Sequence, residues 1–385
     1  MSDRKLRAWQ AAGLIDAGTA ARITAWEAAH SRPIGVWAIW GIGALTIGLG
    51  LVSLVAANWE AIPGTTRLAI HMILMAALGG WIWHSLPKRQ MHDQVHDALL
   101  FLLAVLGLTF FGHLGQVYQT SSPLWQPLLV WILLFSPLLL LHGRGWPVAG
   151  LWMAGLLGTM WAHVDDYGHA WSLWSRTRLS HPSLYWGLIA CPPIIVAGAA
   201  AWLRGSSERP AFWRLLEQMA VIIILVGVSL FILVVGWDGV RNILPGSLTI
   251  HAIVMLLTAA IIAHARPTPS GRATAALIAV AAALHLGQAL LPDMHRAVRP
   301  WTGSLVFCLL WGAAAAAAIY AGWRRMFQIA VALVALRIII LSFELNDDLL
   351  GSGVGLILSG LFAMAVAWGT VRLSRRYAPE KGEVA

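Results

Sequence analysis

Four histidines inside apolar segments are the residues of this sequence with the clearest chemical potential. His71 and His113 lie in two consecutive apolar segments, and His251 and His285 lie in another consecutive pair. Imidazole titrates near neutral pH, and an ionisable side chain within a membrane is costly and therefore a candidate for function. If consecutive segments are antiparallel helices, each pair brings its two imidazoles to a similar depth. The sequence therefore predicts two histidine pairs as candidate proton or substrate sites.

Polar side chains accompany both histidine pairs. Gln116 and Gln288 each follow the second histidine of a pair by three residues, which places glutamine and histidine on one helical face. Glu60 and Asp238 precede the first segment of each pair and are predicted at the mouth of the site. We expect the histidines and glutamines to form a polar layer in the outer third of the membrane.

Three interpretations of this layer stay open. The side chains could form interhelical hydrogen bonds that hold each half of the protein together, typically at about 0.6 kcal/mol per bond. They could instead bind a proton or a substrate where two repeats meet. Four imidazoles and two carboxylates would suit zinc or copper by ligand type, but no HxxxH spacing supports a metal. No metal or cofactor is therefore predicted.

Arg337 is a further charge deep inside an apolar segment. Glu344 follows it by seven residues, which is two helical turns along the same face, and is its predicted partner. A buried ion pair or snorkelling of Arg337 to an interface is one interpretation. Contact with an anion or another substrate is the functional alternative.

The composition requires helices that cross a membrane to position these residues. Hydrophobic residues make up 59% of the 385 and charged residues 11%, against about 25% charged residues in a soluble domain. Hydrocarbon offers no partners for backbone polar groups, and apolar runs of about 20 residues without alternation favour helices over a barrel. The sequence predicts an all-α integral membrane protein with twelve spanning helices: 34–57, 67–86, 96–118, 124–142, 146–163, 183–204, 214–235, 248–265, 272–291, 301–321, 325–345 and 350–371.

The distribution of basic residues predicts an orientation for these helices. With the N-terminus inside, cytoplasmic segments hold nineteen Lys and Arg, outer segments hold six, and Arg337 lies within a span. This is the positive-inside bias, and it explains the net charge of +9 without a nucleic-acid partner. We expect a multi-pass protein of the bacterial inner membrane with cytoplasmic N- and C-termini. Residues 164–182 are then the longest outer loop.

Short sequence matches predict an internal duplication. Residues 113–116, His-Leu-Gly-Gln, recur as residues 285–288, and Pro63-Gly64 recurs as Pro245-Gly246. The matches keep their order along the chain, and each half has an even number of spans, so both halves insert in the same orientation. We expect two parallel six-helix repeats related by a pseudo-two-fold axis along the membrane normal. The predicted segments are a cytoplasmic helical hairpin 1–33, repeats 34–204 and 205–372, and a cytoplasmic tail 373–385.

Local patterns add three structural expectations. Residues 3–31 are predicted to form two short helices broken at Gly13, with Asp16 as the N-cap of the second. This hairpin could lie on the membrane or bind a protein partner. Pro192-Pro193 is expected to kink the sixth span. Small residues spaced by four, such as Gly150, Ala154 and Gly158, are expected to allow close helix packing.

Several segments resemble the bacterial family of predicted membrane proteins called domain of unknown function 2157. The resemblance covers about the first 150 residues. The residues that carry it are Gly13, Leu14, Ile15, Asp16, Ala20, Ile23 and Trp26, then residues 57–63 with Arg67, and residues 115–119. The resemblance implies an inner-membrane protein and carries no activity with it.

Two functional hypotheses follow from these patterns. The first is a permease-like transporter of a small solute or ion, because duplicated six-helix halves with polar groups at their interface are a transporter plan. The alternative is a non-catalytic scaffold or sensor in envelope maintenance that binds a partner through residues 1–33 or 164–182. The sequence contains no HExxH, nucleophile elbow or Walker loop, so an enzyme is the least favoured class. The lipid bilayer is the one partner that the composition requires.

Overall fold

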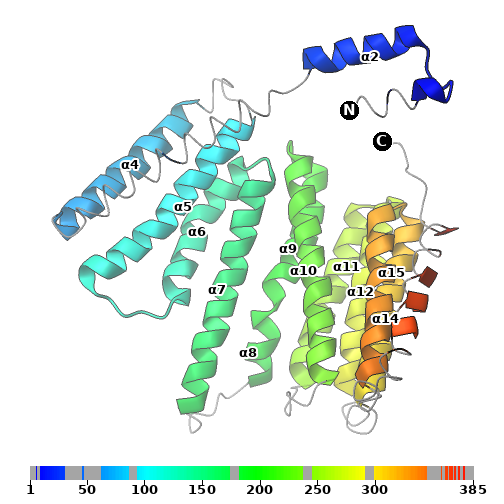
Figure 1. The fold of residues 1–385 in the computed structure, drawn as a ribbon. Helices are drawn as coiled ribbons and strands as arrows, with labels where there is room; N and C mark the ends of the chain where they lie inside the picture. The colour runs from blue at the N-terminus through cyan, green and yellow to red at the C-terminus, as the bar shows by residue number, and fades with distance from the viewer. Residues whose placement is uncertain are drawn as a thin grey trace. The chain divides into compact units, whose positions relative to one another are not determined.

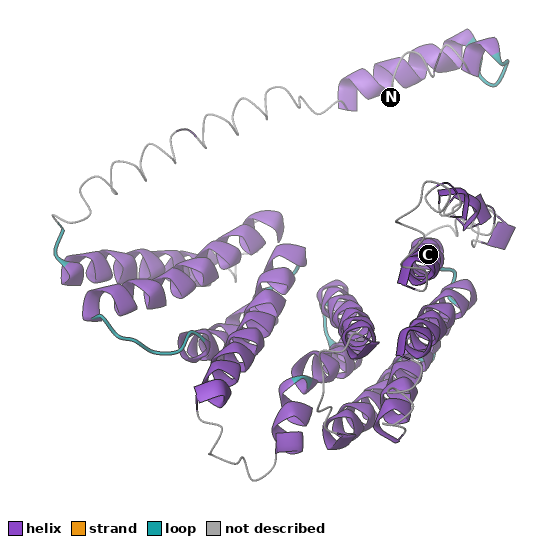
Figure 2. Cartoon of the chain, turned by 60° about the horizontal axis from the view of Figure 1, so that its bottom comes forward, coloured by secondary structure: helices purple, strands orange, loops and turns teal. Residues whose placement is uncertain are grey.

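A computed structural model describes most of the apolar part of the chain (Figure 1). The residues that it describes are Leu6, 9–30, Thr46, 62–85, 93–173, 182–236, 245–290 and 299–344, with isolated positions between 357 and 377. Figure 2 colours these residues by element type, and within them every regular element is a helix and none is a strand. The predicted all-helical class is therefore confirmed for this part of the chain.

The described helices follow the predicted apolar segments closely. They are α2 (Ala17–His30), α4 (Gly64–Ser85), α5 (Asp93–Tyr118), α6 (Trp125–His142), α7 (Trp146–Leu173), α8 (Pro182–Ile189), α9 (Cys191–Ser206), α10 (Pro210–Gly236), α11 (Pro245–Ala265), α12 (Pro269–Leu290), α14 (Arg299–Tyr320) and α15 (Arg324–Glu344). Among the described residues, 9 helical segments are long and apolar enough to cross a membrane, with α8 and α9 together forming one of them. The chain is thus a membrane protein by its helices.

Twelve spans and a tandem repeat remain predictions. Of the predicted first span, 34–57, the structure describes only residue 46, and of the last, 350–371, it describes only scattered positions from 357 onward. The predicted fifth span, 146–163, is helical as α7, but α7 is not one of the 9 apolar segments. The three glycines and the tryptophans of residues 146–163 contribute little hydropathy.

The outer loop expected at residues 164–182 is wrong over its first part. Helix α7 continues through Asp165 and Asp166 to Leu173, while residues 174–181 lie outside the described residues. The side chain of Trp125 on α6 donates a hydrogen bond from Nε1 to Asp166 Oδ2 at 3.0 Å, which ties this extension to a neighbouring helix. The hydropathy of the sequence falls after residue 163 and shows where the apolar segment ends. The helix continues beyond that point to Leu173.

The N-terminal segment forms two helical pieces, as predicted. The chain divides into two compact units, residues 1–70 and 71–385. In the first unit, Gly13 has a φ of +68°, and the backbone N–H of Leu14 donates to Trp9 O at 3.0 Å. This is the hydrogen bond of a Schellman motif, in which glycine ends a helix in the left-handed conformation. Asp16 Oδ1 then accepts a hydrogen bond of 2.7 Å from the Thr19 N–H, the N-cap of α2.

Helix α10 lies at the centre of the buried core of the second unit. It packs against α7, α9, α12 and α14. Leu216, Ala220 and Ile224 line one face of α10 and are buried. Trp311 on α14 donates a hydrogen bond from Nε1 to Ser229 Oγ on α10 at 3.1 Å. The core therefore joins residues from both predicted repeats.

The predicted kink at Pro192-Pro193 is present as a break in the helix. Helix α8 ends at Ile189, and α9 begins at Cys191. A proline ring removes a backbone donor and clashes with the preceding turn, so two successive prolines in the first turn start a new helix. Cys191 follows the break and donates its S–H to Gly187 O at 3.0 Å.

Close packing along α7 occurs at a different glycine from those expected. A Cβ atom built on Gly158 would meet nothing within 4 Å, whereas one on Gly155 would overlap the indole ring of Trp131. Trp131 is fully buried, and its Nε1 donates to Ala104 O on α5 at 2.8 Å. Gly155 therefore faces α6, while Gly158 faces open space.

Candidate functional site

The rings of His71 on α4 and His113 on α5 contact each other. Their Nδ1 atoms are 2.9 Å apart, and the ring planes are nearly perpendicular, at 86°. The Nε2 atom of His71 lies 2.8 Å from the carbonyl oxygen of Leu106, also on α5. Only 7% of His71 is exposed. An imidazole pair thus joins two helices that are each apolar enough to cross a membrane.

For neutral rings, these two contacts determine which nitrogens of the pair carry hydrogen. A carbonyl oxygen only accepts hydrogen bonds, so Nε2 of His71 must carry the hydrogen that points to Leu106. A neutral imidazole has one N–H, which makes Nδ1 of His71 an acceptor. The hydrogen between the two rings must then sit on Nδ1 of His113. These assignments follow from the hydrogen-bond geometry.

The glutamines and acids predicted for this layer are either exposed or outside the described residues. Gln116 is exposed on α5, and the predicted layer of histidines and glutamines is not supported there. The side chain of Gln288 lies outside the described residues, as do Glu60 and Asp238. Phe110 is a further ring neighbour of His71, edge-on at 5.4 Å between ring centroids.

His251 on α11 and His285 on α12 form a looser second pair. Their ring centroids are 6.0 Å apart. His251 Nε2 lies 3.2 Å from the carbonyl oxygen of Trp186 on α8. Nδ1 of His285 is buried and has no hydrogen-bond partner among the described residues. In both pairs, therefore, the first histidine bonds a backbone carbonyl of another helix.

The described residues do not form the four-histidine metal site considered above. No group of three or more His, Cys, Asp or Glu side chains in that part of the chain could hold a metal ion. The metal interpretation needs both histidine pairs around one ion, and the described residues provide them only as separate pairs.

Arg337 and Glu344 form the ion pair that the spacing predicts. Nη1 and Nη2 of Arg337 donate to Oε1 and Oε2 of Glu344 at 2.8 and 2.9 Å. Only 5% of Arg337 is exposed. Two parallel hydrogen bonds between a guanidinium and a carboxylate are the strong form of this interaction.

Glu217 is a buried charge that the sequence analysis missed. It lies near the start of α10 and is 2% exposed. Arg204 on α9 donates from Nη1 to its Oε2 at 3.3 Å, and Arg266, just after α11, donates to its Oε1. The sequence does contain an indication of this pairing. An acidic residue at the end of a span, where several arginines lie, is expected to pair with them.

Asp97 is a second buried acid that the sequence analysis missed. Its Oδ1 accepts the backbone N–H of Arg144 at 3.0 Å. Both ring nitrogens of its neighbour His96 are buried without a hydrogen-bond partner in the described part of the chain. Arg209, in the connection between α9 and α10, lies close by. Burial and the charge of Arg144 lower the pKa of Arg209, whereas the Asp97 carboxylate raises it.

Comparison with known proteins supports the resemblance of the N-terminal part. Residues 7–148 match the model of a family described as "Predicted membrane protein (DUF2157)". No curated protein and no solved structure matches the chain. The match covers α2 to α6, including His71 and His113, and its description states no activity.

Proposed function

We propose that the protein is a permease for a small solute or ion and that the His71–His113 pair binds a proton during transport. The observation that carries this proposal is the hydrogen bond of 2.9 Å between two imidazoles on neighbouring apolar helices. Polar groups that titrate near neutral pH are scarce in membrane spans because they are costly there.

The hydrogen bond between the rings limits how many protons the pair can take. A proton added to His71 would have to go to Nδ1 and would set two N–H donors face to face. We infer that the pair carries at most one added proton, because two adjacent cations in a medium of low dielectric repel each other.

The proposal includes the predicted topology. The protein sits in the bacterial inner membrane with both termini in the cytoplasm, in accordance with the positive-inside bias. The two parallel repeats each contribute a histidine pair, which in the second half is His251 and His285. Transport by rocking of one repeat against the other is the mechanism usual for such duplicated folds.

Proton flux into proteoliposomes tests the role of the pair. Vesicles with a trapped pH dye are given an acid-outside pH gradient. We expect His113→Gln and His71→Gln to lower the protein-dependent proton flux by at least tenfold. His264→Gln, which changes an exposed histidine on α11, serves as the control and should leave the flux unchanged. Equal flux in all variants, or no flux above protein-free vesicles, would contradict the proposal.

A scaffold or sensor is the second candidate, and the N-terminal unit favours it. Leu14 and Trp26 are large apolar side chains exposed on this short helical segment. Apolar side chains on a surface helix favour contact with a protein or a membrane. Deletion of residues 2–31 should then change the proteins that co-purify with the chain while the spans still insert. An unchanged set of co-purifying proteins would argue against this candidate.

A further inference from the structure

We propose that the protein binds the phosphate group of an anionic phospholipid at Arg204 and Arg266, where the apolar segments that contain α9 and α11 end. The two arginines share one acid, Glu217 on α10. Nη1 of Arg204 donates to its Oε2 at 3.3 Å, and Nη1 of Arg266 donates to its Oε1. This site is independent of the histidine pairs and of the proposed transport.

The three side chains carry one uncompensated positive charge. Two guanidinium groups and one carboxylate together have a formal charge of +1. Around them, residues 204–217 and 266–272 hold five arginines and two glutamates, which leaves three positive charges in excess. Clustered positive charge of this kind attracts the anionic lipids of a membrane surface.

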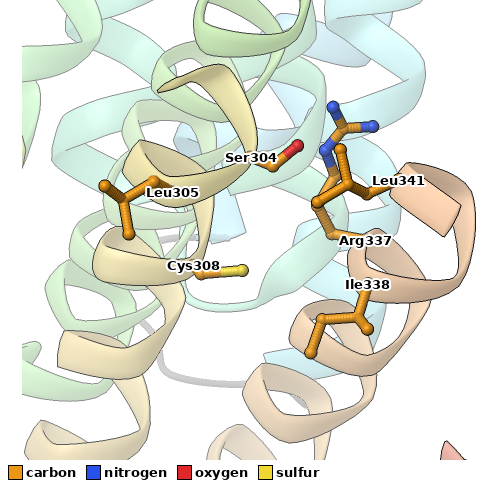
Figure 3. A pocket seen from close by; sticks show the side chains of 6 residues that line it. All are labelled: Ser304, Leu305, Cys308, Arg337, Ile338 and Leu341. Atoms are coloured by element: carbon orange, nitrogen blue, oxygen red, sulfur yellow. The ribbon is translucent and has the colours of Figure 1, made fainter. Parts of the chain in front are cut away.

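The pair of Arg337 and Glu344 has the contrasting balance of charge. Glu344 accepts hydrogen bonds from both Nη atoms of Arg337, so that pair is neutral. In Figure 3, Arg337 lies with apolar side chains such as Ile338 and Leu341, where an added anion would be heavily penalised. Glu217 instead divides its two oxygens between two arginines, and each arginine keeps donors that the carboxylate does not use.

Arg204 has donors that a lipid can reach. Its side chain is 28% exposed, whereas those of Arg266 and Glu217 are 13% and 3% exposed. Within the described residues, the guanidinium of Arg204 bonds to Glu217 through Nη1, so Nε and Nη2 are available. These two atoms lie on one edge of the guanidinium and form the fork that binds phosphate through two parallel hydrogen bonds. Arg204 is therefore the main contact, and Arg266 adds a second positive charge beside it.

Both guanidinium groups lie at the depth of lipid headgroups. The two apolar segments end at Ser206, two residues after Arg204, and at Ala265, one residue before Arg266. Segments of 23 and 20 residues correspond to about 34 and 30 Å of helix, and the hydrocarbon core of a bilayer is about 30 Å thick. The ends of these segments therefore lie beside the phosphate groups of the lipids.

This position favours an anionic lipid over other sources of phosphate. A zwitterionic headgroup brings its own cation to a surface that is already positive, whereas the headgroup of phosphatidylglycerol brings none. A free phosphate must be ordered from solution, but a lipid is already confined to the membrane, so its effective concentration at the site is high. Leu203, beside Arg204, is an exposed apolar side chain that an acyl chain can contact.

Lipid binding to the whole protein in detergent tests the site. Native mass spectrometry during titration with phosphatidylglycerol, or with phosphatidylcholine of the same acyl chains, gives the two dissociation constants. We expect phosphatidylglycerol to bind at least tenfold more tightly. Inorganic phosphate at a tenfold molar excess over the lipid should displace no more of it than chloride does at the same ionic strength. Equal affinity for the two lipids, or displacement by inorganic phosphate, would overturn the proposal.

Variants of Arg204 test the fork. Arg204→Gln should weaken the binding of phosphatidylglycerol at least fivefold and leave that of phosphatidylcholine unchanged. Arg204→Lys keeps the charge without the fork, so its loss should be smaller. Arg325→Gln removes an exposed arginine of α15 and should bind as the unmodified protein does. Unchanged affinity in Arg204→Gln, or an equal loss in Arg325→Gln, would overturn the proposal.

Photocrosslinking locates the lipid without any variant. Phosphatidylglycerol with a photoreactive headgroup is irradiated with the unmodified protein, and the crosslinked peptides are identified by mass spectrometry. We expect crosslinks in residues 203–207 and 265–268 to be at least fivefold more abundant than in residues 321–326, between α14 and α15. Equal abundance in both regions would show only a general attraction of lipid to basic helix ends and would overturn the proposal. This measurement decides the case even if Arg204→Gln does not fold.

Discussion

The guanidinium of Arg209 donates a hydrogen bond from Nη2 to the carbonyl oxygen of Leu140 at 2.7 Å. Nη1 of the same side chain donates to the carbonyl oxygen of Gly143. The last carbonyl groups of a helix have no partner within it, and a cation there also interacts favourably with the helix dipole. A residue in the connection between α9 and α10 thus caps α6.

Replacement of this cap should destabilise the protein. Arg209→Met removes both donors and is expected to lower stability by about 1.5–3 kcal/mol, the range for hydrogen bonds to charged groups. Arg209→Lys keeps the charge but loses the forked geometry. Its stability should lie between that of Arg209→Met and that of the unmodified protein. The measurement is the midpoint of thermal unfolding in detergent. Arg214→Met, at an exposed position of α10, is the control, and an equal loss in that variant would refute the capping role.

Loss of the Glu217 carboxylate should be more severe. Glu217→Gln leaves Arg204 and Arg266 without their shared acid, and breaking a buried ion pair typically costs about 3–5 kcal/mol. Glu208→Gln removes an exposed acid nearby and should change little. Thermal unfolding of both variants at the same detergent concentration compares them. Similar midpoints for the two would mean that Glu217 contributes no more than a surface charge.

The two glycines of α7 should respond oppositely to a methyl group. Gly155→Ala forces Trp131 to move, and overpacking of this kind typically costs about 1–3 kcal/mol. Gly158→Ala adds a methyl group where nothing lies within 4 Å, and alanine also has the higher helix propensity. We expect only the first variant to unfold at a lower temperature. The reverse order would place Gly158 at the helix contact instead.

The N-cap of α2 should weaken in acid. Hydrogen bonds from the side chain and the backbone N–H of Thr19 lower the pKa of Asp16 below its usual value. A depressed pKa in the folded state means that the ionised carboxylate stabilises the cap above the unfolded pKa. That contribution is lost as pH falls through the folded pKa.

Hydrogen exchange at the Thr19 amide measures this cap. Exchange relative to the intrinsic rate should accelerate as the pH is lowered through the acidic range in the unmodified protein. Asp16→Ala should show fast exchange at every pH, and Asp16→Asn, which caps without titrating, should keep its protection throughout. A protection factor in the unmodified protein that does not depend on pH would refute the carboxylate's role.

The tautomers of the first histidine pair give a spectroscopic prediction. Nitrogen-15 spectra of histidine-labelled protein at neutral pH should show Nε2–H on His71 and Nδ1–H on His113. The second form is the less common one in free histidine, so it should stand out. Leucine in place of His71 removes the acceptor, and the His113 signal should then shift toward the Nε2–H form. An Nε2–H signal for His113 in the unmodified protein would contradict the geometry.

Periodicity and charge predicted the features that lie within one helix or between helices consecutive in the sequence. The pairing of Arg337 with Glu344 follows from a spacing of seven residues on one helix, and the break before Pro192 follows from proline geometry. The contact of His71 with His113 follows from equal depth on consecutive antiparallel helices. Each of these relations is local or joins neighbours in the sequence.

The features that were missed join residues distant in sequence. Glu217 pairs with Arg266 across 49 residues, whereas the sequence around Arg266 indicates only the topology of the chain. Gly155 was overlooked because spacing shows which small residues share a face but not which helix that face meets. Gln116 shares a helical face with His113 by spacing, yet the structure leaves it exposed. Contacts of this kind depend on the packing of whole helices, which one segment does not encode.

The break at Ala190 separates the short helix α8 from α9. Eight residues span about 12 Å at 1.5 Å per residue, so a tilt of about 10° would move the far end by about 2 Å. At Trp186, halfway along, the same tilt away from α11 moves the carbonyl by about 1 Å. Its present distance of 3.2 Å from His251 Nε2 would then exceed the reach of a hydrogen bond. Helix α8 also packs against α11, so the hydrogen bond of His251 helps to hold α8 at its present angle.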